Sequence, residues 1–171
     1  ASYFCPDVDF IIDIGGQDVK VLRVEDGVMT NFQMNDKCAA GTGRFLEMMA
    51  RTMEMSLDDM GKAGLSYKED ITISSMCTVF AESEVVSLIA QNKATDDIVH
   101  GLNKAVASKT AALAKRVGGE ERYMMTGGVS KNQGLVKTLE EKLGTTLVIS
   151  DKAQLCGALG AALFAKDMVT E

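Results

Sequence analysis

Two cysteines, Cys38 and Cys77, each lie shortly before a segment that has the pattern of a helix. Cys38 precedes a helix whose apolar face begins at Phe45, and Cys77 comes directly before a helix expected over about 78–91. The N-terminus of a helix carries a partial positive charge and free N–H groups, which favour thiolates and anionic clusters. We therefore predict that both cysteines are metal ligands, each suited to hold part of an iron–sulfur cluster.

Each of these cysteines has an alternative interpretation as a small, buried apolar side chain. Their matching positions favour a ligand role, although two thiolates do not complete the usual four-cysteine site. Two copies of the chain related by a two-fold axis would supply four thiolates, with the cluster on the axis. Cys5 and Cys156, the other two cysteines, are predicted to be structural.

A pair of glycines follows the first predicted strand, in the segment 13–18 (DIGGQD). Because they lack a Cβ, Gly15 and Gly16 can take positive φ and turn their N–H groups toward a phosphate. Asp13 and Asp18 are candidates to hold Mg²⁺ through water, and Gln17 is a candidate to orient a water nucleophile. We therefore predict a phosphate-binding turn in which Asp13, Gln17 and Asp18 are catalytic.

A second pair of glycines stands between a predicted strand and a helix that Ser130 is expected to cap. Thr126, Gly127 and Gly128 there resemble a nucleotide-binding turn between a strand and a helix. The alternative is that both glycine pairs form only tight turns, where glycine is the usual residue. The pairs are expected at opposite ends of the fold, and their joint presence, one flanked by acids, favours nucleotide binding.

The pattern of apolar residues predicts an α/β domain that positions these candidates. Segments 8–14, 19–24 and 28–35 read as strands of an antiparallel meander, with a type I′ turn at Asp26-Gly27. His100, the only histidine, is expected to be solvated on a helix, and the eleven methionines are expected to fill the core. Further strands are predicted at 71–74, 123–126 and 146–149, helices at about 45–53, 78–91, 98–117, 130–143 and 155–166, and a short helix or loop at 56–66.

Composition restricts the possible classes of function. The chain has 171 residues, 46% of them hydrophobic and 25% charged, as in an ordinary globular domain. A net charge of −6 and the lack of a Lys/Arg block argue against nucleic acid or an anionic membrane as a partner. The sequence contains no long apolar run and no signal peptide at its start, so a cytoplasmic location is expected.

Five motifs together resemble one protein family: DIGGQD, NDKCAAGTGRF, CTVFAESE, MTGGV and GALGAA. They are similar to the ATPase activators of 2-hydroxyacyl-CoA dehydratases and to the related ATPase subunits of benzoyl-CoA reductase. The resemblance covers nearly the whole chain. It implies an actin-like ATPase (ribonuclease H-like) fold of the acetate/sugar kinase–chaperone–actin type.

The resemblance also implies a cofactor and a reaction. It predicts a homodimer with one bridging [4Fe-4S] cluster, held by Cys38 and Cys77 of both protomers. Segment 13–18 would correspond to the second phosphate loop of the family, and 126–128 to its adenosine loop, so ATP or ADP with Mg²⁺ is expected. Hydrolysis of ATP would drive one electron to a 2-hydroxyacyl-CoA dehydratase or a related acyl-CoA reductase.

One motif of the family is missing from the sequence. Nothing matches the Asp-x-Gly-Ser/Thr phosphate loop that opens the first half of the family's fold. We therefore expect residues 1–171 to form a single domain that corresponds to the C-terminal half of the ATPase. The cluster ligands would be complete in this half, whereas its ATPase activity alone would be incomplete.

Two other classes of function remain open. One is a sugar-kinase-like or chaperone-like nucleotide-binding domain without a cluster, whose ligand binding would not depend on Cys38 or Cys77. The other is a dimerisation module with neither a cluster nor affinity for nucleotides.

Overall fold

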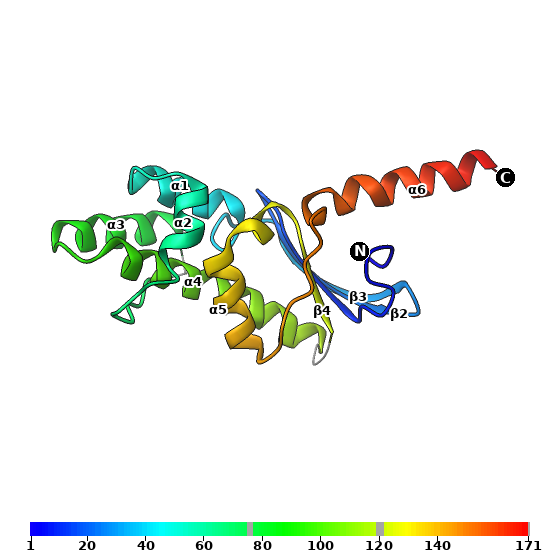
Figure 1. Cartoon of the computed structure of the whole chain (residues 1–171), viewed down its shortest axis with the longest axis horizontal. Coiled ribbons are helices and arrows are strands. Elements are labelled where there is room, and N and C mark those ends of the chain that lie inside the picture. Colours follow the sequence, from blue (N-terminus) through cyan, green and yellow to red (C-terminus); the bar gives the residue numbers. More distant parts are fainter. Residues whose placement is uncertain (75–76, 119–121, 171) are drawn as a thin grey trace.

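A computed structural model describes residues 1–74, 77–118 and 122–170 (Figure 1). The described residues form a four-stranded mixed sheet with the strand order β3-β2-β1-β4, flanked by helices. Helices α1, α2 and α3 gather at one end of the molecule, and α6 extends away from the opposite end. The predicted α/β class is confirmed.

The first three strands form the predicted antiparallel meander. They are β1 (Phe10–Ile14), β2 (Val19–Glu25) and β3 (Val28–Asn35). Asp26 and Gly27 connect β2 and β3 with φ angles of 52° and 77°. A type I′ turn requires positive φ at both central residues, so the turn is of the predicted kind.

Strand β4 (Tyr123–Thr126) pairs with β1 in parallel and brings the C-terminal part of the chain onto the sheet. The strand predicted at 146–149 is reduced to a single bridge between Val148 and Met124. The ladder stops there because the neighbouring N–H of Leu147 donates to the Glu140 carboxylate at 2.8 Å. Among the described residues, this β-bridge is the only pairing between the 146–149 segment and β4.

Residues 71–74 lie outside the sheet, so the strand predicted there is wrong. The N–H of Ile71 donates to the Glu69 carbonyl, and that of Ser74 donates to the Glu84 carboxylate at 2.7 Å. These donors are therefore used locally rather than in a ladder. Ile71 and Ile73 still enter the core, with exposed fractions of 7% and 4%.

Six helices complete the described fold, near the predicted positions. Ser56 caps α2 by accepting the Asp59 N–H, and Gly118 ends α4 with a φ of 83°; Gly119, also predicted at this end, lies outside the described residues. Helix α5 is capped by Asn132 and not by the predicted Ser130, because a short 3-10 helix over Gly128–Lys131 intervenes. The helices are α1 (Gly43–Thr52), α2 (Leu57–Ala63), α3 (Thr78–Ala90), α4 (Thr95–Val117), α5 (Gln133–Leu143) and α6 (Cys156–Thr170).

Helix α4 is the centre of the core, since it packs on β2, β3 and α5. His100 of α4 is only 5% exposed and stacks on the Tyr67 ring, with ring centroids 3.5 Å apart. The expectation of a solvated histidine is therefore wrong, and its burial lowers the pKa of His100. Met49, Met60, Met124 and Met125 are fully buried, as predicted, whereas Met29, Met34 and Met168 are exposed, so the methionines fill the core only in part.

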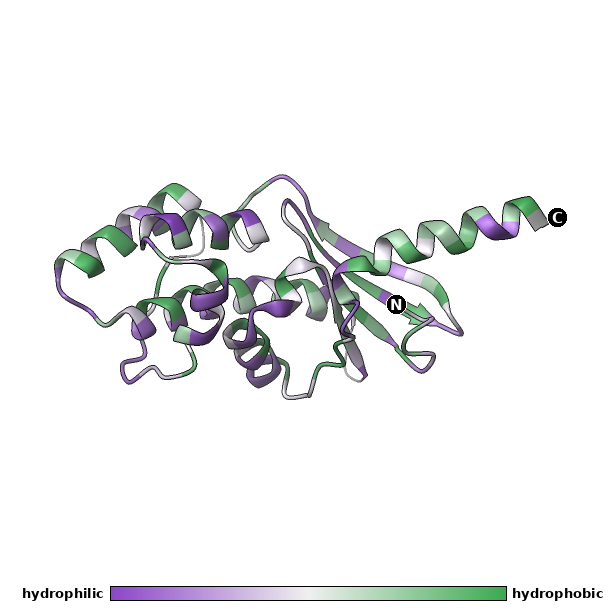
Figure 2. Ribbon diagram, turned by 45° about the horizontal axis from the view of Figure 1, so that its top comes forward, coloured by the Kyte–Doolittle hydropathy of each residue, from purple (hydrophilic) through white to green (hydrophobic). Residues whose placement is uncertain are grey.

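Helix α6 projects from the body of the protein and is rich in apolar residues (Figures 1 and 2). Phe164 and Met168 are 75% and 81% exposed. At its start, Cys156 is buried against Val8 and Met124, which agrees with a structural role. Among the described residues, no helix combines the length and the apolar character needed to cross a membrane.

Candidate functional site

The two glycine turns lie side by side, not at opposite ends of the fold as expected. Strands β1 and β4 are parallel neighbours, and Asp13 at the end of β1 is in register with Thr126 at the end of β4. The Thr126 hydroxyl donates to the Asp13 carboxylate at 2.6 Å. The parallel pairing therefore joins the two turns into one edge of the sheet.

Gly127 is required by this close approach. Its φ is 86°, and a Cβ added to it would lie 2.3 Å from the carbonyl oxygen of Ile14. Side chains are excluded both by this backbone conformation, with ψ at 168°, and by the contact with the backbone of β1.

Gly15 and Gly16 do not have the positive φ that was expected of them. The N–H of Gly15 donates to the Asp18 carbonyl at 3.0 Å and closes the turn, so it does not face an anion. Gly16 differs, because a Cβ added to it would meet no atom within 4 Å. The missing side chain at Gly16 leaves open space.

Helix α1 begins directly on this first turn. The N–H of Gly43 donates to the Gly15 carbonyl, and that of Arg44 donates to the Gly16 carbonyl, both at 2.8 Å. A Cβ on Gly43 would lie 2.9 Å from the Gly15 oxygen, so only glycine permits this contact. Gly43 was not among the predicted site residues, although two glycines around a threonine at a helix start signal a close approach.

A cavity of about 410 Å³ opens between the two turns and the helices α1 and α2. Of the predicted nucleotide-binding residues, Gly16 and Gly128 line it, whereas Gly15, Gln17, Thr126 and Gly127 do not. Its size suits a small-molecule ligand. The lining residues that were not predicted are Gly43, Leu46, Glu47, Leu57, Asp58, Val129, Lys131, Asn132 and Gln154.

The three predicted catalytic residues belong to the first turn but stand outside the lining of this cavity. Asp13 accepts the Thr126 hydroxyl, and Asp18 forms an ion pair with Lys20 at 2.6 Å. Gln17 is exposed. The two carboxylates are thus held at the edge of the turn by their own partners.

Cys77 is the N-cap of α3, as predicted, with an extended backbone at φ −148° and ψ 137°. Cys38 does not occupy the matching position, because Thr42 is the residue before α1. The first N–H groups of α1 are also used by the Gly15–Gly16 turn. Both thiols are free and half-buried, and α1 packs against α3. In the part of the chain that the structure describes, no three metal-binding side chains gather into one site.

The mixed sheet with its parallel β1–β4 edge and flanking helices has the predicted actin-like ATPase fold. The chain belongs to the BadF/BadG/BcrA/BcrD ATPase family, whose model matches residues 1–165. The resemblance stated from the motifs is therefore confirmed at the level of the family.

Characterised relatives in this family include activators of acyl-CoA enzymes. The chain is 53% identical over 165 residues to the (R)-2-hydroxyglutaryl-CoA dehydratase activating ATPase of Acidaminococcus fermentans, covering 96% of the chain and 64% of the relative. The crystal structure of that component A superposes with a TM-score of 0.95 at 50% identity, covering 99% of this chain and 66% of that one.

Two further relatives extend the comparison. The activator of 2-hydroxyisocaproyl-CoA dehydratase from Clostridium difficile, solved with bound ADPNP, has a TM-score of 0.95 at 45% identity over 99% of this chain and 63% of that one. A benzoyl-CoA reductase component of Thauera aromatica is 30% identical over 96% of this chain and 61% of its own length. The chain thus spans slightly under two thirds of the length of these relatives.

Proposed function

We propose that this chain is the cluster-bearing part of an ATP-dependent activator that delivers single electrons to a 2-hydroxyacyl-CoA dehydratase or a related acyl-CoA reductase. The proposal includes a homodimer, one shared [4Fe-4S] cluster, and ATP or ADP with Mg²⁺. Identity to activators of such enzymes over almost the whole chain supports the partner class.

One observation carries the proposal: helix α1 is hydrogen-bonded to the candidate phosphate turn and begins five residues after Cys38. The carbonyls of Gly15 and Gly16 accept the N–H groups of Gly43 and Arg44. A shift of the turn around a nucleotide would therefore be transmitted to α1 and to the loop that carries Cys38. A protein that switches between two conformations with its nucleotide needs such a link between the ligand and a helix.

The nucleotide would lie in the cavity between the two glycine turns. Gly16 and Gly128 open space for it, while Thr126 and Gly127 hold the second turn against β1. Asp13 and Asp18 would hold Mg²⁺ through water, and Gln17 would orient the attacking water. Because the chain covers only part of its relatives, we expect this part alone to bind nucleotide weakly and to turn over little ATP.

The cysteines fit a cluster shared between two protomers. Cys38 and Cys77 are free, half-buried thiols, and Cys77 is the N-cap of a helix of 13 residues. One chain offers two thiolates where four are usual, so a second copy is needed. When bound, a [4Fe-4S] cluster supplies one-electron transfer at low potential.

Anaerobic purification with iron–sulfide reconstitution tests the cluster. We expect a brown dimer with about four irons per two chains, detected by absorption, EPR and metal analysis. Cys38→Ser and Cys77→Ser should each lose the cluster, whereas Cys5→Ser, at another half-buried free cysteine, should retain it. A colourless wild type, or equal iron in all three variants, would contradict the proposal.

Calorimetric titration with Mg·ADP tests the nucleotide site. Gly16→Ala should weaken binding without loss of stability, since the added Cβ meets no atom yet enters the cavity. Gly157→Ala, in α6 and equally free of contacts, is the control. Binding of nucleotide or sugar that persists when both Cys38 and Cys77 are replaced, in a protein that never takes up iron, would instead indicate a kinase-like or chaperone-like domain.

A further inference from the structure

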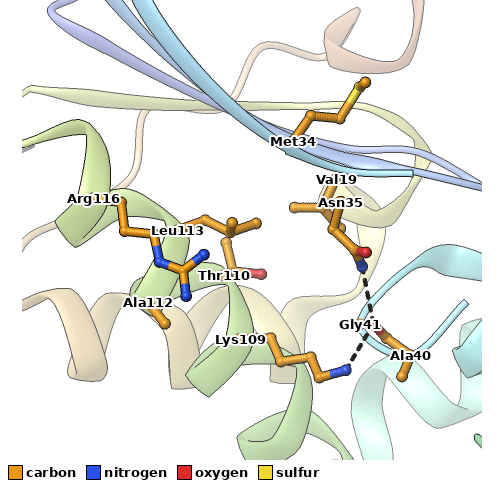
Figure 3. Close-up of a pocket in the computed structure, with 10 residues that line it drawn as sticks. All are labelled: Val19, Met34, Asn35, Ala40, Gly41, Lys109, Thr110, Ala112, Leu113 and Arg116. Carbon is orange, nitrogen blue, oxygen red and sulfur yellow. Dashed lines mark hydrogen bonds between the residues drawn. The ribbon is translucent and has the colours of Figure 1, made fainter. Parts of the chain in front are cut away.

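A second cavity, of about 290 Å³, lies between α4 and the ends of β2 and β3 (Figure 3). Lys109, Thr110 and Arg116 line it from α4, and Asn35 and the backbone of Gly41 line it from the opposite side. It shares no lining residue with the candidate nucleotide cavity. It is therefore a separate site, and the activity proposed above does not use it.

The lining of this cavity is positively charged in a chain whose net charge is −6. Lys109 and Arg116 are seven residues apart on α4, which places them on the same face of the helix, and none of the lining residues is acidic. The Lys109 ammonium contacts the Ala40 carbonyl at 3.4 Å, a long hydrogen bond to a neutral group. Its charge is thus left without a carboxylate partner in the cavity.

Thr110 supplies an independent indication of a ligand. The residue is only 1% exposed, and its hydroxyl has no hydrogen-bond partner among the described residues. Figure 3 shows this hydroxyl directed toward the side of the cavity where Lys109 and Asn35 lie. A buried hydroxyl without a partner is unfavourable, and an acceptor atom in the cavity would satisfy it.

We propose that this cavity binds a small organic anion through a single carboxylate or phosphate group. Arg116 and Lys109 would contact the anionic oxygens with charge-assisted hydrogen bonds, and Thr110 would donate a third hydrogen bond. Val19 and Leu113 form an apolar wall for a short hydrocarbon part. A volume at the lower end of ligand pockets limits the ligand to a few non-hydrogen atoms beyond that group.

Ligand binding here would act on the Cys38 loop. The Lys109 side chain lies against Gly41, whose added Cβ would be 3.2 Å from the Lys109 Cδ, and its ammonium holds the Ala40 carbonyl. An anion that attracts the Lys109 ammonium would weaken its hydrogen bond to the Ala40 carbonyl. The rate of alkylation of Cys38 in a Cys5→Ser, Cys77→Ser, Cys156→Ser background therefore provides a second measurement.

The test is calorimetric titration of the full chain with inorganic phosphate and, separately, with butyrate. We expect saturable binding of at least one of them, and the preference between the two identifies the anionic group. Arg116→Gln and Lys109→Gln should each weaken binding about tenfold, as for the loss of one charge-assisted hydrogen bond. Lys115→Gln removes a neighbouring exposed charge of α4 outside the cavity and should leave the affinity unchanged.

Two controls separate this site from others. Gly16→Ala, in the candidate nucleotide cavity, should not change the affinity, and Mg·ADP should not compete. An anion effect on Cys38 alkylation that disappears in Arg116→Gln supports the site independently of calorimetry. No saturable binding of either anion at millimolar concentration, or an equal loss of affinity in Lys115→Gln, would overturn the proposal.

Discussion

Replacing Gly127 with alanine should be among the most damaging single-methyl changes in this protein. Gly127 has φ 86° and ψ 168°, a conformation almost restricted to glycine, in which alanine costs about 1–3 kcal/mol. The new Cβ would also lie 2.3 Å from the Ile14 oxygen and 2.7 Å from its carbonyl carbon. Ile14 is fully buried and paired with Val19 of β2, so it cannot move away. Overpacking against such a rigid neighbour adds about 1–3 kcal/mol, which gives about 2–6 kcal/mol in total.

Gly144→Ala is the matched control for this experiment. Gly144 also has a positive φ, of 70°, but a Cβ there would meet no atom within 4 Å. Its replacement should therefore cost only the backbone strain, about 1–2 kcal/mol. Urea unfolding followed by far-UV circular dichroism measures both free energies. Their difference reports the contact with Ile14 together with the more restricted ψ of Gly127, which is 168° against 24° at Gly144. Equal destabilisation in the two variants would refute the reasoning.

Three further changes test other contacts. Thr126→Val removes the hydroxyl that donates to the Asp13 carboxylate and should lower the free energy of unfolding by about 1–3 kcal/mol in urea titrations. Asn132→Ala removes the N-cap of α5 and should cost about 1 kcal/mol by the same measurement. Burial lowers the pKa of His100, so the unfolded chain binds its proton more readily, and stability should fall as the pH drops through about 6.5. In NMR, the C2–H resonance of the single histidine should therefore titrate below pH 6.5. In Asp70→Asn it should titrate lower still, because the negative charge of Asp70 raises the pKa of His100.

Each of these changes has an outcome that would contradict it. Thr138→Val removes another buried hydroxyl, which donates to a neutral helix carbonyl, and should cost less than Thr126→Val. Ser130→Ala should cost less than Asn132→Ala, because Ser130 donates only to the Gly127 carbonyl and does not cap the helix. A histidine resonance that titrates at the ordinary value would show that His100 is solvated.

The meander was predictable from sequence because its signals are local. Alternating apolar residues and the Asp26-Gly27 turn specify antiparallel pairing between adjacent segments. The same holds for the Ser56 cap of α2 and for the glycine that ends α4. The family was also predictable, since its motifs lie in short continuous stretches.

The assembly of the candidate site was not predictable from local patterns. The neighbouring positions of the two turns depend on the parallel pairing of Asp13 with Thr126, and no local sequence signal specifies that pairing. Helix α1 starts at Gly43, well after Cys38, because its first N–H groups reach the carbonyls of a distant turn. The burial of His100 was not predictable either, because Tyr67, whose ring stacks on it, comes from a remote loop.

The pairing of β1 with β4 also has a consequence for the folding kinetics. Asp13 and Thr126 are 113 residues apart, so closing this contact has a large entropic cost, whereas the meander needs only short loops. The meander should form early, and the cavity between the turns should form among the last features. A nucleotide that binds only the completed cavity should therefore slow unfolding and leave the folding rate unchanged.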